Sequence, residues 1–109
     1  MDEQDFRKKC DAALELLRQR LLDVGDEHGF EVEGQGEKIE IQFEEPEPTR
    51  FVISPNTPVR QIWISALTTS FKLSWSETAS AFVLEKTGET LQQLMGRILT
   101  QQLGTAVAV

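Results

Sequence analysis

The chain has 109 residues, 39% of them hydrophobic, and a formal net charge of −7, which fits one acidic globular domain with its own core. The acidic excess argues against a nucleic-acid binder and against adhesion to an anionic membrane surface, because both need basic residues. A single cysteine, Cys10, excludes an internal disulfide, and the chain lacks a membrane-length apolar run and a secretory signal, so we expect a cytoplasmic protein.

The first predicted element is a helix over residues 2–24. Apolar side chains recur there at steps of three and four and form one stripe along the helix. The stripe consists of Phe6, Cys10, Ala13, Leu14, Leu17, Leu21 and Val24. Gly25 follows the stripe and is expected to end the helix, because glycine readily adopts the left-handed backbone of a C-cap.

Six strands are predicted next, because short stretches of alternating apolar and polar residues are typical of half-buried β-structure. They cover residues 30–33, 38–43, 51–53, 60–65, 70–75 and 80–86. Gly34-Gln35-Gly36 predicts a hairpin turn between the first two strands. Further turns are expected at Pro46 and Pro48, over residues 55–58, and over residues 76–78.

A second helix is predicted after Gly88. Thr90 and Gln93 have the spacing of a capping box, the apolar stripe runs to Leu103, and Gly104 is expected to end the helix. Short links throughout predict an α+β, two-layer sandwich, with a mostly antiparallel six-stranded sheet and both helices on one face. We assign residues 1–104 to this single domain and residues 105–109 to a short apolar tail, which either packs between the helices or frays.

Trp63 is the most informative residue of the predicted sheet. Ile62 and Ile64 are expected to face the helices, so Gln61 and Trp63 fall on the opposite, uncovered face. An exposed Trp is a preferred anchor of protein–protein contacts. The residues alone leave a second interpretation open, in which Trp63 is shielded by a loop or packs on a cross-strand neighbour.

Charge divides unevenly along the chain. Residues 1–48 contain 15 acidic and 6 basic residues, whereas residues 49–109 contain 3 acidic and 5 basic residues. An acidic half of this kind indicates a cation site or a basic partner. The alternative is that the acids only keep a small protein in solution.

The segment from Pro58 to Ser65, PVRQIWIS, resembles the signature strand of the frataxin family. That signature has a Pro, two further residues, then Gln, an aliphatic residue, Trp and another aliphatic residue. The acidic first helix, the two acidic-aliphatic strands and Gly88-Glu89-Thr90 before the last helix agree with the bacterial CyaY branch over residues 3–104. The resemblance implies an α–β sandwich with a mostly antiparallel sheet under two helices.

The resemblance also implies weak iron binding by an acidic ridge at the end of the first helix and on the first strand. The matching residues here are Asp23, Asp26, Glu27, Glu31 and Glu33. Carboxylate oxygens suit ferrous and ferric iron without strong selectivity, and a cation relieves the repulsion between crowded carboxylates. We therefore expect weak, salt-sensitive iron binding and no organic cofactor. For each carboxylate the alternative is a solvated surface charge.

Three residues are weaker candidates for the same ridge. Asp11 and Glu15 lie four residues apart on the solvent face of the first helix, and His28, in the loop after Glu27, offers a nitrogen ligand. Arg18 lies three residues beyond Glu15 and is expected to pair with it. Together with Gln19 and Leu22, Arg18 thins the ridge where bacterial frataxins often continue with acids, so the metal and its affinity stay open.

Two protein partners are implied by the resemblance: the cysteine desulfurase of iron–sulfur cluster assembly and its scaffold protein. Gln61 and Trp63 match the exposed Gln and Trp that contact these partners in the family, and Asn56 stands in the preceding turn, where the family usually has a polar amide. The predicted function is therefore an iron-binding regulatory adaptor, monomeric and without enzymatic activity. Whether it activates or inhibits the desulfurase is not defined by the sequence.

Two alternative functions are a ferroxidase or iron-storage activity and a generic protein-interaction domain. A ferroxidase normally holds two irons between paired Glu-x-x-His motifs, and the sequence has one histidine, His28. The sequence also lacks a nucleophile–base pair, a Gly-rich phosphate loop and a Cys/His metal motif.

Overall fold

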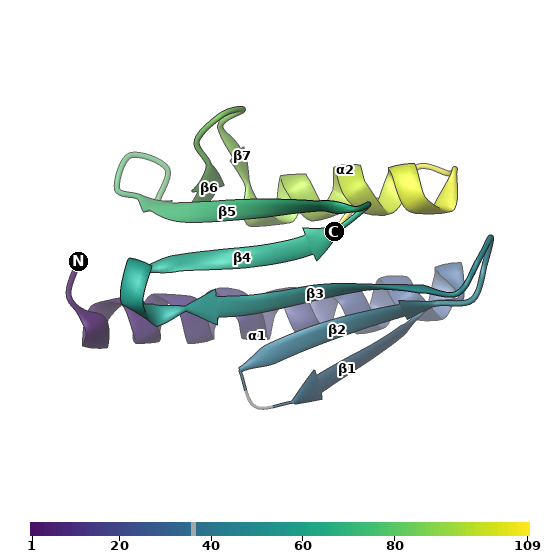
Figure 1. Cartoon of the computed structure of the whole chain (residues 1–109), viewed down its shortest axis with the longest axis horizontal. Helices are drawn as coiled ribbons and strands as arrows, with labels where there is room; N and C mark the ends of the chain where they lie inside the picture. Colours follow the sequence, from purple (N-terminus) through teal and green to yellow (C-terminus); the bar gives the residue numbers. More distant parts are fainter. Residues whose placement is uncertain (36) are drawn as a thin grey trace.

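A computed structural model of the chain describes residues 1–35 and 37–109 (Figure 1). The elements are α1 (Glu3–His28), β1 (Glu31–Gln35), β2 (Lys38–Phe43), β3 (Thr49–Asn56), β4 (Gln61–Ala66), β5 (Thr69–Ser76), β6 (Ala81–Leu84), β7 (Glu89–Thr90) and α2 (Leu91–Leu103). A 3-10 turn, Thr57–Val59, joins β3 to β4. The α+β class is confirmed, but the described residues form seven strands rather than six.

The strands form one antiparallel sheet whose order, β1 to β7, is the order along the chain. The additional strand is β7, whose two residues pair with Val83 and Leu84 of β6. A two-residue strand is too short to show the alternation from which strands are predicted. The predicted hairpin between the first two strands is confirmed, because β1 pairs with β2 up to Gln35 and Lys38. Gly34 and Gln35 belong to β1 rather than to the turn, and Gly36 lies outside the described residues.

β3 is longer than predicted, because it continues through Asn56 instead of ending at Ile53. The expected turn over residues 55–58 is therefore wrong in its first half: Pro55 pairs with Ile62 and Asn56 pairs with Gln61. A proline is tolerated near a strand end, where its missing N–H group interrupts little of the ladder. This register places Asn56 beside the strand that carries Trp63.

α1 is longer than predicted and does not end at Gly25. It begins at the Asp2 N-cap, whose Oδ1 accepts a hydrogen bond from the Asp5 backbone N–H at 2.7 Å. It continues to His28, and the left-handed C-cap is Gly29, with φ of 78°. Gly25 is buried inside the helix. A Cβ atom at this position would lie 2.8 Å from the backbone oxygen of Phe30, so a larger residue does not fit without a shift. Gly25 thus serves close packing, and Asp26, Glu27 and His28 form the last turn.

The capping box of α2 is confirmed. The Gln93 backbone N–H donates to Thr90 Oγ1 at 3.2 Å, and the Thr90 backbone N–H donates to Gln93 Oε1 at 3.0 Å. Gly104 ends the helix in the left-handed conformation, as predicted. Arg97 of α2 donates to both carboxylate oxygens of Glu89, at 2.8 and 2.9 Å, and so links the helix to β7.

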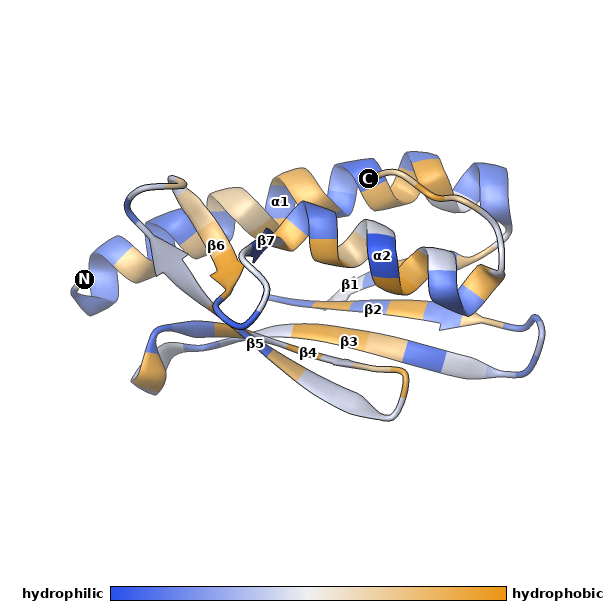
Figure 2. Cartoon of the chain, turned by 90° about the horizontal axis from the view of Figure 1, so that it is seen from above, coloured by the Kyte–Doolittle hydropathy of each residue, from blue (hydrophilic) through white to orange (hydrophobic). Residues whose placement is uncertain are grey.

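The two helices cover one face of the sheet and leave the other face open (Figure 2). The core between the layers combines the α1 stripe, the inward residues of the strands and the α2 stripe. The C-terminal tail turns back onto α2, where Val107 is buried and its backbone N–H donates to Thr100 Oγ1 at 3.0 Å. Over the described parts of the chain, neither helix combines the length and apolar character needed to cross a membrane.

Candidate functional site

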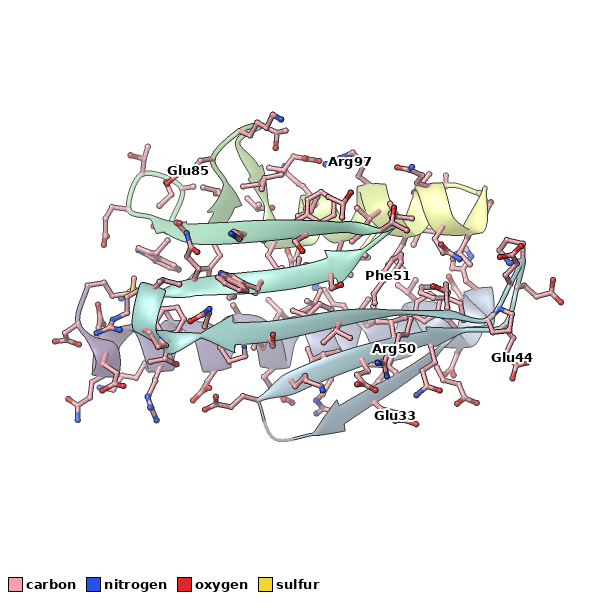
Figure 3. All side chains as sticks on the ribbon, viewed as in Figure 1. Glu33, Glu44, Arg50, Phe51, Glu85 and Arg97 are labelled. Carbon is pink, nitrogen blue, oxygen red and sulfur yellow. The ribbon has the colours of Figure 1, made fainter. Side chains whose placement is uncertain are left out.

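The predicted iron ligands lie around the edge of the molecule where α1 ends and β1 begins. Asp23, Asp26 and Glu27 are exposed on α1, and Glu31 and Glu33 are exposed on β1. Val32, between the two glutamates, packs against the core, so both glutamates project from the open face of the sheet. Figure 3 shows Glu33 on this strand. The predicted ridge is therefore divided by the edge of the sheet. Its α1 residues lie on the helix side, and its β1 residues lie on the open face.

His28 does not lie in a loop, as predicted, but is the last residue of α1 and is half-buried. The correction follows from the longer helix, because the C-cap is Gly29 rather than Gly25. A half-buried His at a helix C-terminus is well placed to interact with the negative end of the helix dipole. Its part in metal binding stays a prediction.

The carboxylates of the edge do not converge on one point. No three His, Cys, Asp or Glu side chains among residues 1–35 and 37–109 approach one another as the ligands of a metal ion do. Hard cations such as Ca²⁺ take six or more oxygen ligands, and here each carboxylate would supply one or two. The donor chemistry suits iron, but the geometry fits a loosely held, largely hydrated ion and no closed site.

The predicted pair between Arg18 and Glu15 is confirmed. Arg18 Nη2 lies 2.7 Å from Glu15 Oε1 and Arg18 Nε lies 3.1 Å from Oε2, and Gln19 Nε2 donates to Oε1 at 3.1 Å. The hydrogen bonds from Arg18 and Gln19 lower the pKa of Glu15 and keep it ionised. Both oxygens of the Glu15 carboxylate therefore already accept hydrogen bonds from Arg18 and Gln19 of the same helix.

A groove between α1 and the β1–β2 hairpin contains two of the three weaker candidates, Asp11 and Glu15. Its lining is formed by Asp11, Leu14, Glu15, Arg18, Gly34, Glu37, Lys38 and Ile39. Glu37 and Lys38 were not predicted from the sequence, because their position beside α1 depends on the pairing of β1 with β2. The signal that could have found them is the charged pair directly after the Gly-rich segment. The groove contains both signs of charge.

A second shallow hollow lies beyond the end of α1, on the open face. This hollow is lined by Gly29, Glu31, Gln42, Phe43, Glu44, Pro48, Thr49 and Arg50. Figure 3 shows Glu44 near the turn between β2 and β3 and Arg50 further along β3. Glu44 was also missed, although the run Glu44-Glu45-Pro46-Glu47 marks an acidic turn in the sequence. This hollow therefore places the carboxylates of Glu31 and Glu44 beside the positive charge of Arg50.

Trp63 lies on the open face, as predicted, and 37% of it is exposed. Its Nε1–H donates to Gln61 Oε1 at 2.9 Å, and Gln61 Nε2 donates to Ser74 Oγ at 3.2 Å. Lys72 Nζ lies 4.8 Å from the centre of the Trp63 ring, a cation–π distance. These contacts hold the indole in one orientation while leaving part of it accessible.

The surroundings of Trp63 differ sharply in charge from the β1 edge. The chain from Pro48 to Ser76, which contains β3, β4 and β5, has no Asp or Glu. By register, Ser54 and Lys72 flank Trp63 on the open face, and Asn56 and Ser74 flank Gln61. The three predicted partner-binding residues therefore share one small, acid-free surface, which we call the Trp63 face.

Cys10 is a buried core residue and lies away from this surface. Burial raises the pKa of its thiol to about 12, with smaller contributions from the charges of Asp11 and Glu37. Because the thiolate is the reactive form, we expect Ellman's reagent at pH 8 to modify the folded chain at least about 100-fold more slowly than the urea-unfolded chain. Similar rates in the two states, followed by absorbance, would contradict this assignment.

A family model described as a frataxin-like domain matches residues 1–105 of the chain. The chain is 27% identical over 90 residues to the iron-sulfur cluster assembly protein CyaY of Pseudomonas fluorescens (strain Pf0-1), covering 81% of this chain and 80% of that one. It is 26% identical over 93 residues to the protein of the same name from Pseudomonas syringae pv. tomato (strain ATCC BAA-871 / DC3000), covering 84% and 83%.

The fold also resembles a solved structure, the frataxin from Psychromonas ingrahamii. The TM-score is 0.74, and the match covers 99% of this chain and 97% of the other. At 16% sequence identity this likeness concerns the fold. It agrees with the sandwich of two helices on an antiparallel sheet described above.

Proposed function

The chain belongs to the frataxin-like family, and we propose that it serves iron–sulfur cluster assembly as a non-catalytic, monomeric adaptor in the cytoplasm. The adaptor docks on the cysteine desulfurase and the scaffold protein and binds iron weakly at its acidic edge. This edge consists of the predicted ridge residues Asp23, Asp26, Glu27, Glu31 and Glu33. The names of its CyaY relatives support the assembly role. The single observation that carries the docking part is the exposed Trp63 on an acid-free face beside an acidic edge.

In this proposal, two neighbouring surfaces contribute to docking in different ways. The acidic edge, with Glu31 and Glu33, attracts a basic partner surface and raises the rate of encounter. The Trp63 face supplies the short-range contact, because a part-exposed Trp held in one orientation loses little side-chain entropy on binding. Iron held by the edge carboxylates would compete with the basic partner for the same charges.

The proposal predicts binding to a purified cysteine desulfurase that depends strongly on salt. At about 0.5 M salt the screening length falls to a few ångströms, so we expect affinity at least about tenfold lower than at 0.05 M. Biolayer interferometry measures this directly. Absence of binding at low salt would overturn the proposed function, and salt-insensitive binding would restrict docking to the Trp63 face.

A matched pair of variants separates local charge from net charge in that experiment. Glu31→Gln with Glu33→Gln removes two carboxylates from the acidic edge, and Glu77→Gln with Glu85→Gln removes two from the other end of the sheet. Figure 3 shows Glu85 far from Glu33 across the strands. We expect the first pair to weaken desulfurase binding and the second to leave it within about twofold.

A further inference from the structure

Gln61 lies between Trp63 and Ser74 and uses both ends of its side-chain amide within the chain. Its Oε1 accepts the hydrogen bond from Trp63 Nε1–H at 2.9 Å, and its Nε2 donates to Ser74 Oγ at 3.2 Å. An indole N–H can only donate, so the amide oxygen must face Trp63 and the amide nitrogen must face Ser74. The two bonds together fix the Gln61 amide in one orientation.

The register of the sheet brings these three side chains together. Gln61 and Trp63 are two residues apart on β4 and project from the same face, and Ser74 lies directly opposite Gln61 on the neighbouring strand β5 (Figure 1). Gln61 and Ser74 are both half-buried, so water competes less for their hydrogen bond than it would at a fully exposed site. A half-buried anchor on β5 thus supports the more exposed indole on β4.

Lys72 restrains the same indole in a different way. Its ammonium lies over the ring of Trp63, and the Lys72 side chain is exposed. A cation over a ring face opposes tilting of the ring but does not select which edge of the ring points in a given direction. The hydrogen bond from Nε1–H is directional and selects the edge that faces Gln61. The orientation of the indole therefore depends on Gln61 and on what holds Gln61.

We infer that Ser74 is a positioning residue for docking: through Gln61 it holds the Trp63 indole in the orientation that meets the partner. The inference rests on the docking part of the proposed function and adds a residue outside the segment Pro58–Ser65. An indole that is free to turn would have to be ordered when the partner binds, and ordering a side chain at an interface costs binding free energy. Ser74 thus raises affinity without contacting the partner.

The first test follows the indole in the free chain by NMR. The chain has two tryptophans, Trp63 and Trp75, and Trp63→Phe assigns their two indole ¹H–¹⁵N signals. We expect Ser74→Ala to speed the exchange of the Trp63 indole proton with water at least about threefold. Trp75 Nε1 is buried, so its exchange should be unchanged and serves as the internal reference. Ser74→Thr keeps a hydroxyl group and should restore the Trp63 rate to within about twofold.

Ser70→Ala is the matched control. Ser70 and Ser74 lie on the same face of β5, each two residues from Lys72, and Ser70 pairs with Ser65 instead of Gln61. Among the described residues, the hydrogen bonds of the Gln61 amide are with Trp63 and Ser74 and do not include Ser70. Ser70→Ala should therefore leave the Trp63 exchange rate unchanged. Circular dichroism checks that both alanine variants are folded.

The second test measures binding to a purified cysteine desulfurase by biolayer interferometry. Ser74→Ala should weaken binding about three- to fivefold, and Ser70→Ala should change it less than about twofold. Phenylalanine at position 63 keeps an aromatic ring but has no N–H for Gln61 to hold. In the Trp63→Phe background, Ser74→Ala should therefore have no further effect, and this double-mutant cycle separates positioning from direct contact.

An unchanged Trp63 exchange rate in Ser74→Ala, or an equal change in Ser70→Ala, would overturn the inference. Equal weakening by Ser74→Ala with and without Trp63→Phe would overturn it too, because Ser74 would then contact the partner itself. Failure of the proposed function looks different. If the unsubstituted chain does not bind the desulfurase at low salt, the docking proposal is contradicted, while the exchange rates still show whether Ser74 holds the indole.

Discussion

Trp63→Ala should weaken binding to the cysteine desulfurase or the scaffold protein at least about tenfold, because buried Trp contacts typically carry 2 kcal/mol or more of binding free energy. The same change should lower the free energy of unfolding by about 1–2 kcal/mol. It removes the hydrogen bond to Gln61, the contact with Lys72 and the part of the open face that the indole covers, but no residue of the core between sheet and helices. Its loss therefore affects the partner far more than the core.

Leu16→Ala is the matched control for this truncation. Leu16 is also a large apolar residue, 46% exposed, but it lies on α1, outside both the Trp63 face and the acidic ridge. Affinity measured by biolayer interferometry should be unchanged in Leu16→Ala, and urea unfolding should give similar stabilities for both variants. A loss of several kcal/mol in Trp63→Ala would show that the indole belongs to the core, and unchanged affinity for both proteins would remove Trp63 from the docking surface.

Gly25→Val should lower the free energy of unfolding by about 2–3 kcal/mol, because overpacking a well-packed site typically costs 1–3 kcal/mol and a Val adds three carbons here. Even a single Cβ atom at this position would lie 2.8 Å from the backbone oxygen of Phe30 and 3.1 Å from Phe30 Cε1. The backbone oxygen cannot rotate away as a flexible side chain would. The end of α1 or the start of β1 must therefore move, and both carry residues of the acidic edge.

Arg20→Val controls for the effect of a β-branched residue in the same helix. Arg20 is exposed, so its replacement should change stability by less than about 1 kcal/mol. Urea denaturation followed by circular dichroism gives both values. If Gly25→Val and Arg20→Val were equally stable, Phe30 would not limit the size of the side chain at position 25. The end of α1 would then have to be explained by its C-cap alone.

Features encoded by local periodicity were predictable from the sequence. The α1 stripe, the capping box of Thr90 and Gln93 and the outward position of Trp63 each depend on residues a few positions apart. The end of α1 was not predictable in the same way. A glycine that ends a helix and a glycine that makes room for a neighbour look alike in sequence, and only the contact with Phe30 distinguishes Gly25 from Gly29.

In the candidate site, too, contacts between residues close in sequence were predictable and contacts made by the tertiary fold were not. The pair of Arg18 with Glu15 was predictable, because residues three apart meet on one helix. Glu37 and Glu44 were not found, since their places beside the ridge depend on strand pairing and on the path of a turn. The family resemblance implied the proposed roles of Gln61 and Trp63, which stay predictions. The arrangement of charges around them came from the register of the sheet.

The identity of strand order and chain order has a kinetic consequence. Each strand can add to the preceding one by closing a short loop, which costs little chain entropy, so the sheet can grow stepwise from any hairpin. The contact of Phe6 with Phe82, at 5.8 Å between ring centres, joins the first helix to the sixth strand and encloses most of the sheet. We therefore expect closure of this long loop, when α1 docks on the sheet, to cost more chain entropy than the formation of any hairpin.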